Sequence, residues 1–97
     1  MAFLRRPHKG EIPLNVIADL PGDATEVARL WVNSERSYVA IGLPDGWSPE
    51  LFGSLLVECV HTAAWAYADV KEKSVEEVLQ AIWSGFDEER ERLSDVD

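Results

Sequence analysis

The chain of 97 residues has little cysteine, little positive charge and no long hydrophobic run. Its single cysteine, Cys59, excludes an intrachain disulfide framework and any zinc or iron–sulfur site that needs several cysteines. A free thiol is typical of a reducing compartment, which predicts a cytoplasmic protein. No stretch approaches the roughly 20 apolar residues of a membrane span, and no apolar run follows Arg5 and Arg6 as in a signal peptide. We therefore expect no membrane partner.

Positive charge is scarce beyond the first ten residues. The chain has 9 basic and 18 acidic residues, which gives a net charge of −9. Three of the bases, Arg5, Arg6 and Lys9, lie in residues 1–10, which contain no acid. The remainder of the chain is strongly acidic and repels phosphate backbones, so we expect no nucleic-acid partner. This distribution predicts a basic flexible arm over residues 1–11 and a single folded domain over residues 12–97.

Motifs that carry catalysis are also missing. Gly42, Gly46 and Gly53 have the spacing of turns or of a helix and form no glycine-rich phosphate loop. Cys59 falls on a helical stripe that is expected to be buried, and a buried thiol in apolar surroundings is inert. Ser54 and Ser84 lie near no evident base. We therefore predict no catalytic residue, no metal site and no cofactor.

The sequence does contain two segments with a period of two. Residues 26–33 and 37–43 alternate and are rich in β-branched and aromatic side chains, which predicts the two strands of a β-hairpin. One face of the first strand is apolar, whereas the other face carries Arg29 beside Trp31.

The loop between these strands determines how their residues pair. A two-residue turn, or a four-residue loop over 33–36, sets Leu30 opposite Val39 and Trp31 opposite Tyr38. An aromatic cross-strand pair of this kind adds roughly 0.2–1 kcal/mol to a sheet. A three-residue loop with a bulge would change the pairing.

Two amphipathic helices follow the hairpin, over about 49–70 and 75–93. The first begins with a capping serine, Ser48, followed by proline, and the second begins with a capping box of Ser74 and Glu77. The side chains expected on the buried stripe of the first helix are Phe52, Leu55, Leu56, Cys59, Val60, Ala63, Tyr67 and Val70.

Charge pairing is expected near the end of the second helix. Glu88 and Arg92 have the (i, i+4) spacing in the favoured orientation, worth about 0.2–0.5 kcal/mol.

These elements predict a two-layer α+β domain in which the hairpin packs on the two helices, completed by dimerisation. The face with Arg29, Trp31 and Tyr38 is too apolar to be left in water. Either the segment 12–20, in which Asn15 favours a short helical turn over 16–20, or a second subunit would cover it.

The polar face of the first helix is a second candidate surface. Glu58, His61, Trp65 and Asp69 lie on one side at 100° per residue. Trp65 either packs into the core or contacts a partner, since an indole is seldom left wet. Glu58 and His61 have the spacing of a di-iron ligand pair, but the pair occurs once, so a solvated face is expected.

Arg29 is unusual inside an apolar strand. Its stem could lie over Trp31 or Tyr38 while its guanidinium reaches an acid. Alternatively it anchors a dimer or an anion.

The pattern from Glu26 to Val32, with Trp47 in a following loop and a helix that ends in Ala66-Tyr67, resembles a known family. This is a family of short bacterial proteins, mostly alphaproteobacterial, classed as a domain of unknown function. Its pattern reads E-h-A-R-h-W-h (h, a hydrophobic residue), a turn, a second strand, a loop with tryptophan and a helix ending A-Y. The resemblance covers about residues 12–90 and implies a small cytoplasmic α+β domain without an assigned activity.

Together these features predict a non-catalytic interaction or adaptor module that acts as a homodimer. Exposed aromatic side chains support this hypothesis, as does the absence of catalytic groups. A small-ligand-binding domain or minor enzyme with a pocket between hairpin and helices is an alternative. An acidic chaperone for a basic client is another.

Overall fold

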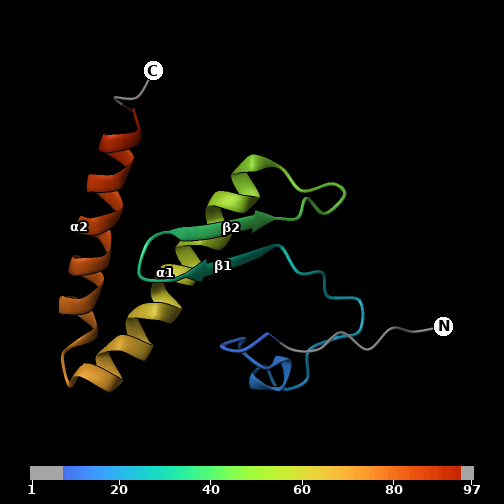
Figure 1. Ribbon diagram of the computed structural model, residues 1–97, viewed down its shortest axis with the longest axis horizontal. Coiled ribbons are helices and arrows are strands. Elements are labelled where there is room, and N and C mark those ends of the chain that lie inside the picture. Colours follow the sequence, from blue (N-terminus) through green and yellow to red (C-terminus); the bar gives the residue numbers. More distant parts are fainter. Residues whose placement is uncertain (1–7, 95–97) are drawn as a thin grey trace. The chain divides into compact units, whose positions relative to one another are not determined.

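The computed structural model describes residues 8–94, so most of the predicted basic arm, residues 1–11, lies outside the described residues. A two-stranded antiparallel hairpin is followed by two packed helices, which confirms the α+β class (Figure 1). The elements are η1 (Leu14–Val16), β1 (Ala28–Val32), β2 (Ser37–Ile41), α1 (Pro49–Lys71) and α2 (Val75–Ser94). The chain forms two compact units that meet between Pro44 and Asp45 in sequence, and each is described by itself.

The hairpin has the predicted register. Leu30 lies opposite Val39, and Trp31 lies opposite Tyr38. Both strands are shorter than expected, because backbone pairing ends in the loop at one end and before Pro44 at the other.

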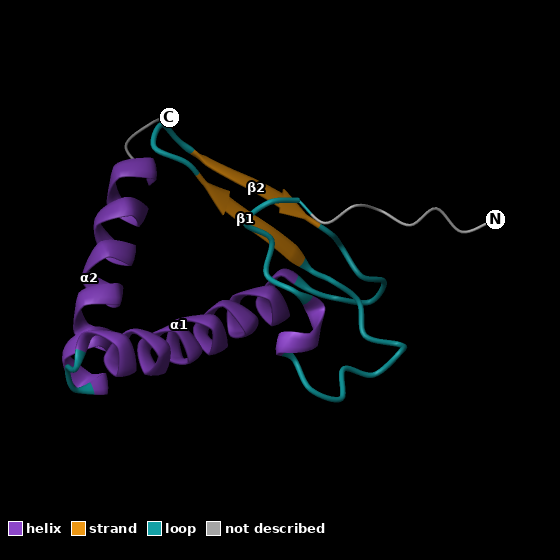
Figure 2. Ribbon diagram, turned by 60° about the horizontal axis from the view of Figure 1, so that its bottom comes forward, coloured by secondary structure: helices purple, strands orange, loops and turns teal. Residues whose placement is uncertain are grey.

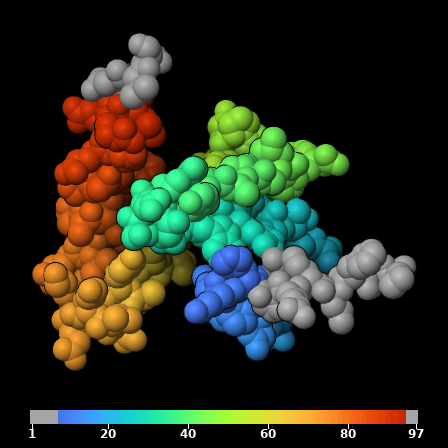
Figure 3. All heavy atoms as spheres, viewed as in Figure 1, coloured from blue at the N-terminus to red at the C-terminus, as the bar shows by residue number. Residues whose placement is uncertain are grey.

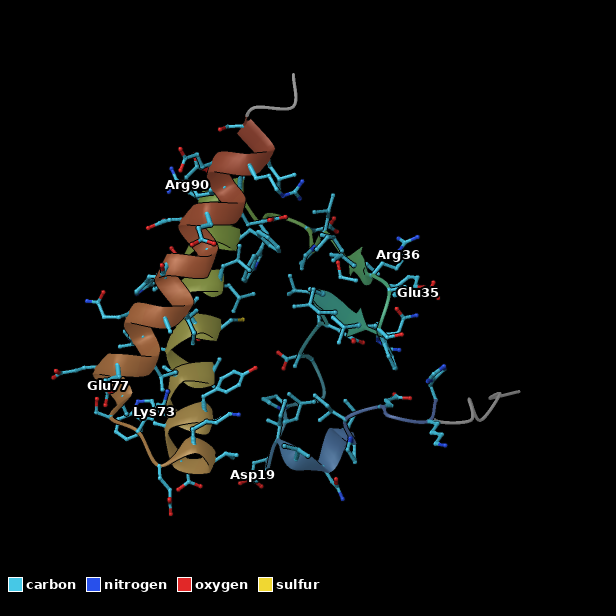
Figure 4. The ribbon with its side chains drawn as sticks, turned by 60° about the vertical axis from the view of Figure 1, so that its left-hand side comes forward. Asp19, Glu35, Arg36, Lys73, Glu77 and Arg90 are labelled. Atoms are coloured by element: carbon cyan, nitrogen blue, oxygen red, sulfur yellow. The ribbon has the colours of Figure 1, made fainter. Side chains whose placement is uncertain are left out.

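Asn33 fixes the four-residue loop that sets this register. Its side-chain Oδ1 accepts hydrogen bonds from the backbone N–H of Glu35 at 2.8 Å and of Arg36 at 2.9 Å. The N–H of Asn33 donates to the Arg36 carbonyl at 3.0 Å, which closes the loop. An asparagine side chain therefore replaces the Asn-Gly turn that the sequence lacks. Glu35 and Arg36 lie at the tip of the hairpin (Figure 4).

The amino-terminal segment forms its helical turn earlier than predicted. The turn is a single 3-10 turn over Leu14–Val16, without a side-chain cap, so the prediction of a turn over 16–20 capped by Asn15 is wrong. Pro13 at the start has φ −64°, the value its ring imposes, and this favours a turn directly after it. The large apolar side chains from Ile12 to Leu20 are exposed.

Helix α1 begins and ends close to the predicted positions. The Ser48 side chain accepts a hydrogen bond from the N–H of Leu51 at 3.1 Å, and Pro49 opens the helix. The helix ends at Glu72 in the left-handed conformation, φ 54°, where the Lys73 N–H donates to the Ala68 carbonyl. No helix within residues 8–94 is long and apolar enough to span a membrane.

The capping box at the start of α2 is confirmed. Ser74 Oγ accepts from the Glu77 N–H at 3.1 Å, and the Ser74 N–H donates to the Glu77 carboxylate at 3.3 Å. Lys73 and Glu77 are labelled at this corner in Figure 4. Near the other end Arg92 pairs with Glu89, with Nε 2.9 Å from Oε1, so the predicted pairing with Glu88 is wrong.

The two helices pack against each other near their connection (Figure 2). Ala64 is completely buried, and Ala68 and Val78 are buried with it. The small alanines let the α2 side chains approach the α1 backbone closely. The side chains of α2 that pack partly buried against this cluster are Val75, Leu79 and Ile82.

The buried stripe of α1 differs from the predicted one. Val60, Ala64 and Ala68, spaced by four residues, are buried. Cys59, Tyr67 and Val70 are exposed, so the prediction that these three side chains are buried is wrong. The difference arises because α2 follows α1 after only three residues. Helix α2 therefore packs on the small side chains of α1, which lie one position after the larger side chains of the predicted stripe.

Candidate interaction surface

One face of the hairpin is apolar and exposed. It consists of alternate residues of the paired strands, whose side chains point to the same side. Leu30 is 70% exposed, Val32 80% and Val39 62%. We call this the apolar hairpin face, and its members are Ala28, Leu30, Val32, Val39 and Ile41. Contiguous exposed apolar side chains of this kind make the face a candidate binding surface.

The opposite face of the hairpin carries the aromatic pair. Trp31 is half-buried, and the His8 ring packs edge-on against it with centroids 4.9 Å apart. The chain around His8 therefore covers part of this face, whereas residues 12–20 or a second subunit were expected to do so. In Figure 3 the amino-terminal segment, in blue, lies beside the hairpin.

Tyr38 belongs to the same face and is held from the hairpin loop. The Arg36 guanidinium carbon lies 4.3 Å from the centroid of the Tyr38 ring. Asn33 Nδ2 donates to the Tyr38 hydroxyl at 3.2 Å. The loop thus positions the phenol as well as the strands, although the ring stays 42% exposed.

Arg29 forms an ion pair with Glu26. Its Nη2 lies 3.1 Å from Glu26 Oε2, and its Nε donates to Oε1 of the same carboxylate. This hydrogen bond and the charge of Glu26 raise the pKa of Arg29 above its usual value, and the charge of Glu11 adds to the effect. The guanidinium has the acidic partner that one interpretation expected. Its role as an anchor for a dimer or an anion remains a prediction.

A shallow hollow of about 350 Å³ runs along the outer edge of β1. Gly10, Glu11, Ile12 and Leu14 line one side, and β1 lines the other together with Glu26. Segment 10–14 therefore lies alongside this strand edge.

The candidate interface residues that the sequence predicted on α1 are all exposed. Trp65 is 68% exposed, and Glu58, His61 and Asp69 are exposed around it. The interpretation of Trp65 as a core residue therefore has no support from its exposure. These four residues belong to one unit, whereas Arg29, Trp31 and Tyr38 belong to the other.

Metal-ligating side chains do not gather in the described part of the chain. Within residues 8–94 no three His, Cys, Asp or Glu side chains are close enough to hold an ion together. Glu58 and Cys59 line a second open hollow on α1, of about 360 Å³, whose other lining residues are Leu55, Thr62, Ala63 and Ala66.

Sequence reasoning missed three residues that organise this surface. Glu26 pairs with Arg29 across a spacing of three residues, His8 packs on Trp31, and Asn33 builds the loop. The preference of asparagine for turns, through side-chain bonds to the backbone two and three residues on, could have indicated Asn33. No local pattern could have indicated His8, because its contact joins segments distant in sequence.

The described residues form a small α+β domain with an exposed apolar hairpin face. The chain belongs to the DUF5076 family, a domain of unknown function, whose profile matches residues 11–93. The expected family resemblance is thereby confirmed. A search of curated proteins found no significant match.

A solved structure from the photosynthetic bacterium Rhodopseudomonas palustrus CGA009 is similar to this chain. The two share 30% sequence identity, with a TM-score of 0.62, over 89% of this chain and 85% of the other. The Rhodopseudomonas protein is provisionally named a pyruvate dehydrogenase.

Proposed function

We propose that this protein is a non-catalytic interaction module that functions as a homodimer. The observation that carries the proposal is the apolar hairpin face, on which Leu30 is 70% exposed, Val32 80% and Val39 62%. Contiguous exposed apolar side chains of this kind are typical of a surface that contacts another protein.

The nature of the exposed surface supports the same function. Large apolar side chains are exposed on the hairpin, and others are exposed on α1, where Trp65 and Val70 are 68% and 77% exposed. Only four hydrophobic residues are buried among those described: Val60, Ala64, Ala68 and Val78. Interfaces of obligate dimers resemble a protein core divided between two chains, and such a surface fits that description.

An enzymatic function has less support. The name of the Rhodopseudomonas protein suggests pyruvate oxidation, which would require a site that encloses the substrate. The hollows beside β1 and on α1 are open to solvent, and neither encloses a substrate, although Glu58 and Cys59 both line the hollow on α1. An interaction module is therefore the better proposal for this chain.

Sedimentation of the purified protein tests the proposal. We expect a particle with twice the chain mass of 10.9 kDa at micromolar concentration. A strict monomer over the whole accessible concentration range would overturn the homodimer. In a parallel assay, pyruvate is added to the protein together with the small molecules of a cell extract, and we expect no release of CO₂. Release of CO₂ by the protein would overturn the non-catalytic function.

A further inference from the structure

Within residues 8–94, the edge of β2 has none of the features that normally protect an edge strand. Natural sheets block exposed edges with charged side chains, prolines, bulges or a covering segment. The strand Ser37–Ile41 contains no charged residue, no proline and no glycine, and all five of its residues are exposed. It pairs with β1 over its full length without a bulge. Such an edge is a template for another strand.

The hydrogen bonds at the two ends of the hairpin identify the outward groups. The Gly42 N–H donates to the Val27 carbonyl at 2.7 Å, and the Asn33 N–H donates to the Arg36 carbonyl at 3.0 Å. Because bonded and non-bonded pairs alternate in an antiparallel ladder, Val39 and its neighbours two residues away direct their N–H and C=O groups outward. The outward residues of β2 are Ser37, Val39 and Ile41.

Almost none of these outward N–H and C=O groups has a hydrogen-bond partner within residues 8–94. Arg36 Nε donates to the Ser37 carbonyl at 3.2 Å, which agrees with an outward direction. Apart from this bond, no hydrogen bond within residues 8–94 reaches the outward backbone groups of Ser37, Val39 or Ile41.

The edge of β1, in contrast, has both a charged side chain and a neighbouring segment. It carries a charged residue, Arg29, held by Glu26, and segment 10–14 lies alongside it. A strand that paired with β1 would have to displace that segment. Of the two edges, β2 is therefore the one that accepts a partner.

We infer that β2 pairs antiparallel with β2 of a second copy, so that Val39 lies opposite Val39 of that copy. This register is the one that pairs all five residues of both strands, and it places outward N–H groups opposite outward C=O groups. About six hydrogen bonds form across the two-fold axis. The product is a four-stranded sheet in the order β1-β2-β2-β1. A sheet with one apolar face needs about three strands to be stable, so the four-stranded sheet exceeds that minimum.

The side chains agree with this two-fold arrangement. Tyr38 lies opposite Ala40 of the second copy, so a large ring meets a small residue. No charged side chain is brought opposite a like charge, because β2 carries none. On the other side, Leu30 and Val39 of both copies form a continuous apolar face. A net charge of −9 on each copy disfavours closer contact elsewhere but leaves this uncharged edge free to pair.

The inference rests on the proposed homodimer, and disulfide trapping tests it separately. The variant Val39→Cys is made in a Cys59→Ser background and oxidised with copper phenanthroline. Hydrogen-bonded residues opposite each other have Cα atoms about 5.5 Å apart, which a disulfide can span. We expect most of the protein to run as a covalent dimer on a non-reducing gel.

The matched control is Leu30→Cys in the same background. Leu30 lies on the same face but one strand inward, about 14 Å from its counterpart across three strand spacings. We expect no covalent dimer. A dimer in sedimentation that cross-links through Leu30→Cys but not through Val39→Cys would overturn the β2 edge and leave the homodimer intact. A monomer in sedimentation would overturn both.

Two oppositely charged variants test the same register if the cysteine variants fold poorly. Val39→Lys and Val39→Glu each place like charges together at the two-fold axis, so each alone is expected to be a monomer. Mixing them in equal amounts should restore a dimer, because lysine then faces glutamate. Failure of the mixture to associate, when each variant retains its helical circular dichroism, would contradict the inferred register.

Discussion

Leu30 lies directly opposite Val39 across the hairpin, and both side chains stay more than half exposed on the same face. A two-stranded sheet with an uncovered apolar face is marginally stable. Its stability in this protein should therefore depend on association. Because only the dimer is stabilised by mass action, we expect a hundredfold increase in protein concentration to add about 2.7 kcal/mol per mole of dimer to the free energy of unfolding and to raise the melting temperature. A melting temperature independent of concentration, measured by calorimetry, would contradict this.

Asn33→Ala should weaken the hairpin loop. The substitution removes an acceptor from the N–H groups of Glu35 and Arg36 and a donor to the Tyr38 hydroxyl. We expect a loss of about 1–2 kcal/mol in the free energy of unfolding, measured with urea. Asn33→Asp is the control, because it keeps the acceptor and should retain most of the stability. Equal losses in both variants would show that the backbone contacts are not the cause.

Ala64→Leu should disrupt the packing of α1 on α2. Ala64 is fully buried against α2, so the three added carbon atoms have no space. Overpacking of this kind costs typically about 1–3 kcal/mol. Ala81→Leu, at an exposed position of α2, is the control and should change the free energy of unfolding by less than about 0.5 kcal/mol. Similar effects at both positions, measured by urea unfolding, would argue against close helix packing at Ala64.

The pair of Glu89 and Arg92 should give α2 a small dependence on pH. The hydrogen bond from Arg92 lowers the pKa of Glu89 below its usual value. Its contribution to stability is therefore complete above the ordinary glutamate pKa of about 4.3, and it is lost as the pH falls through the lower folded-state value. We expect Glu89→Gln to be slightly less stable than the parent at pH 6 and equally stable near pH 2. A difference that grows on acidification would have the wrong sign.

The sequence predicted local structure well because local signals determine it. The period of two predicted the two strands, and a loop of two or four residues predicted the Leu30–Val39 and Trp31–Tyr38 pairs. The capping residues predicted both helix starts. The predicted buried stripe of α1 included Cys59, which is exposed, because the short connection to α2 determines which side of α1 is covered. Contacts between distant segments, such as His8 on Trp31, have no sequence period. The exposed β2 edge depends on what lies beside it in space, and alternation alone does not reveal that.

Ionic strength should distinguish pairing of two acidic copies from binding of a basic client. Each copy carries a net charge of −9, so association of two copies works against repulsion. The Debye length falls from about 10 Å at 0.1 M salt to about 3 Å at 1 M, which screens that repulsion. We therefore expect the dimer dissociation constant, measured by sedimentation, to fall several-fold between these concentrations. Binding to poly-lysine, a probe for the acidic chaperone, should weaken over the same range. A dimer that dissociates as salt is added would show that ion pairs hold the copies together, and an uncharged β2 edge could not supply them.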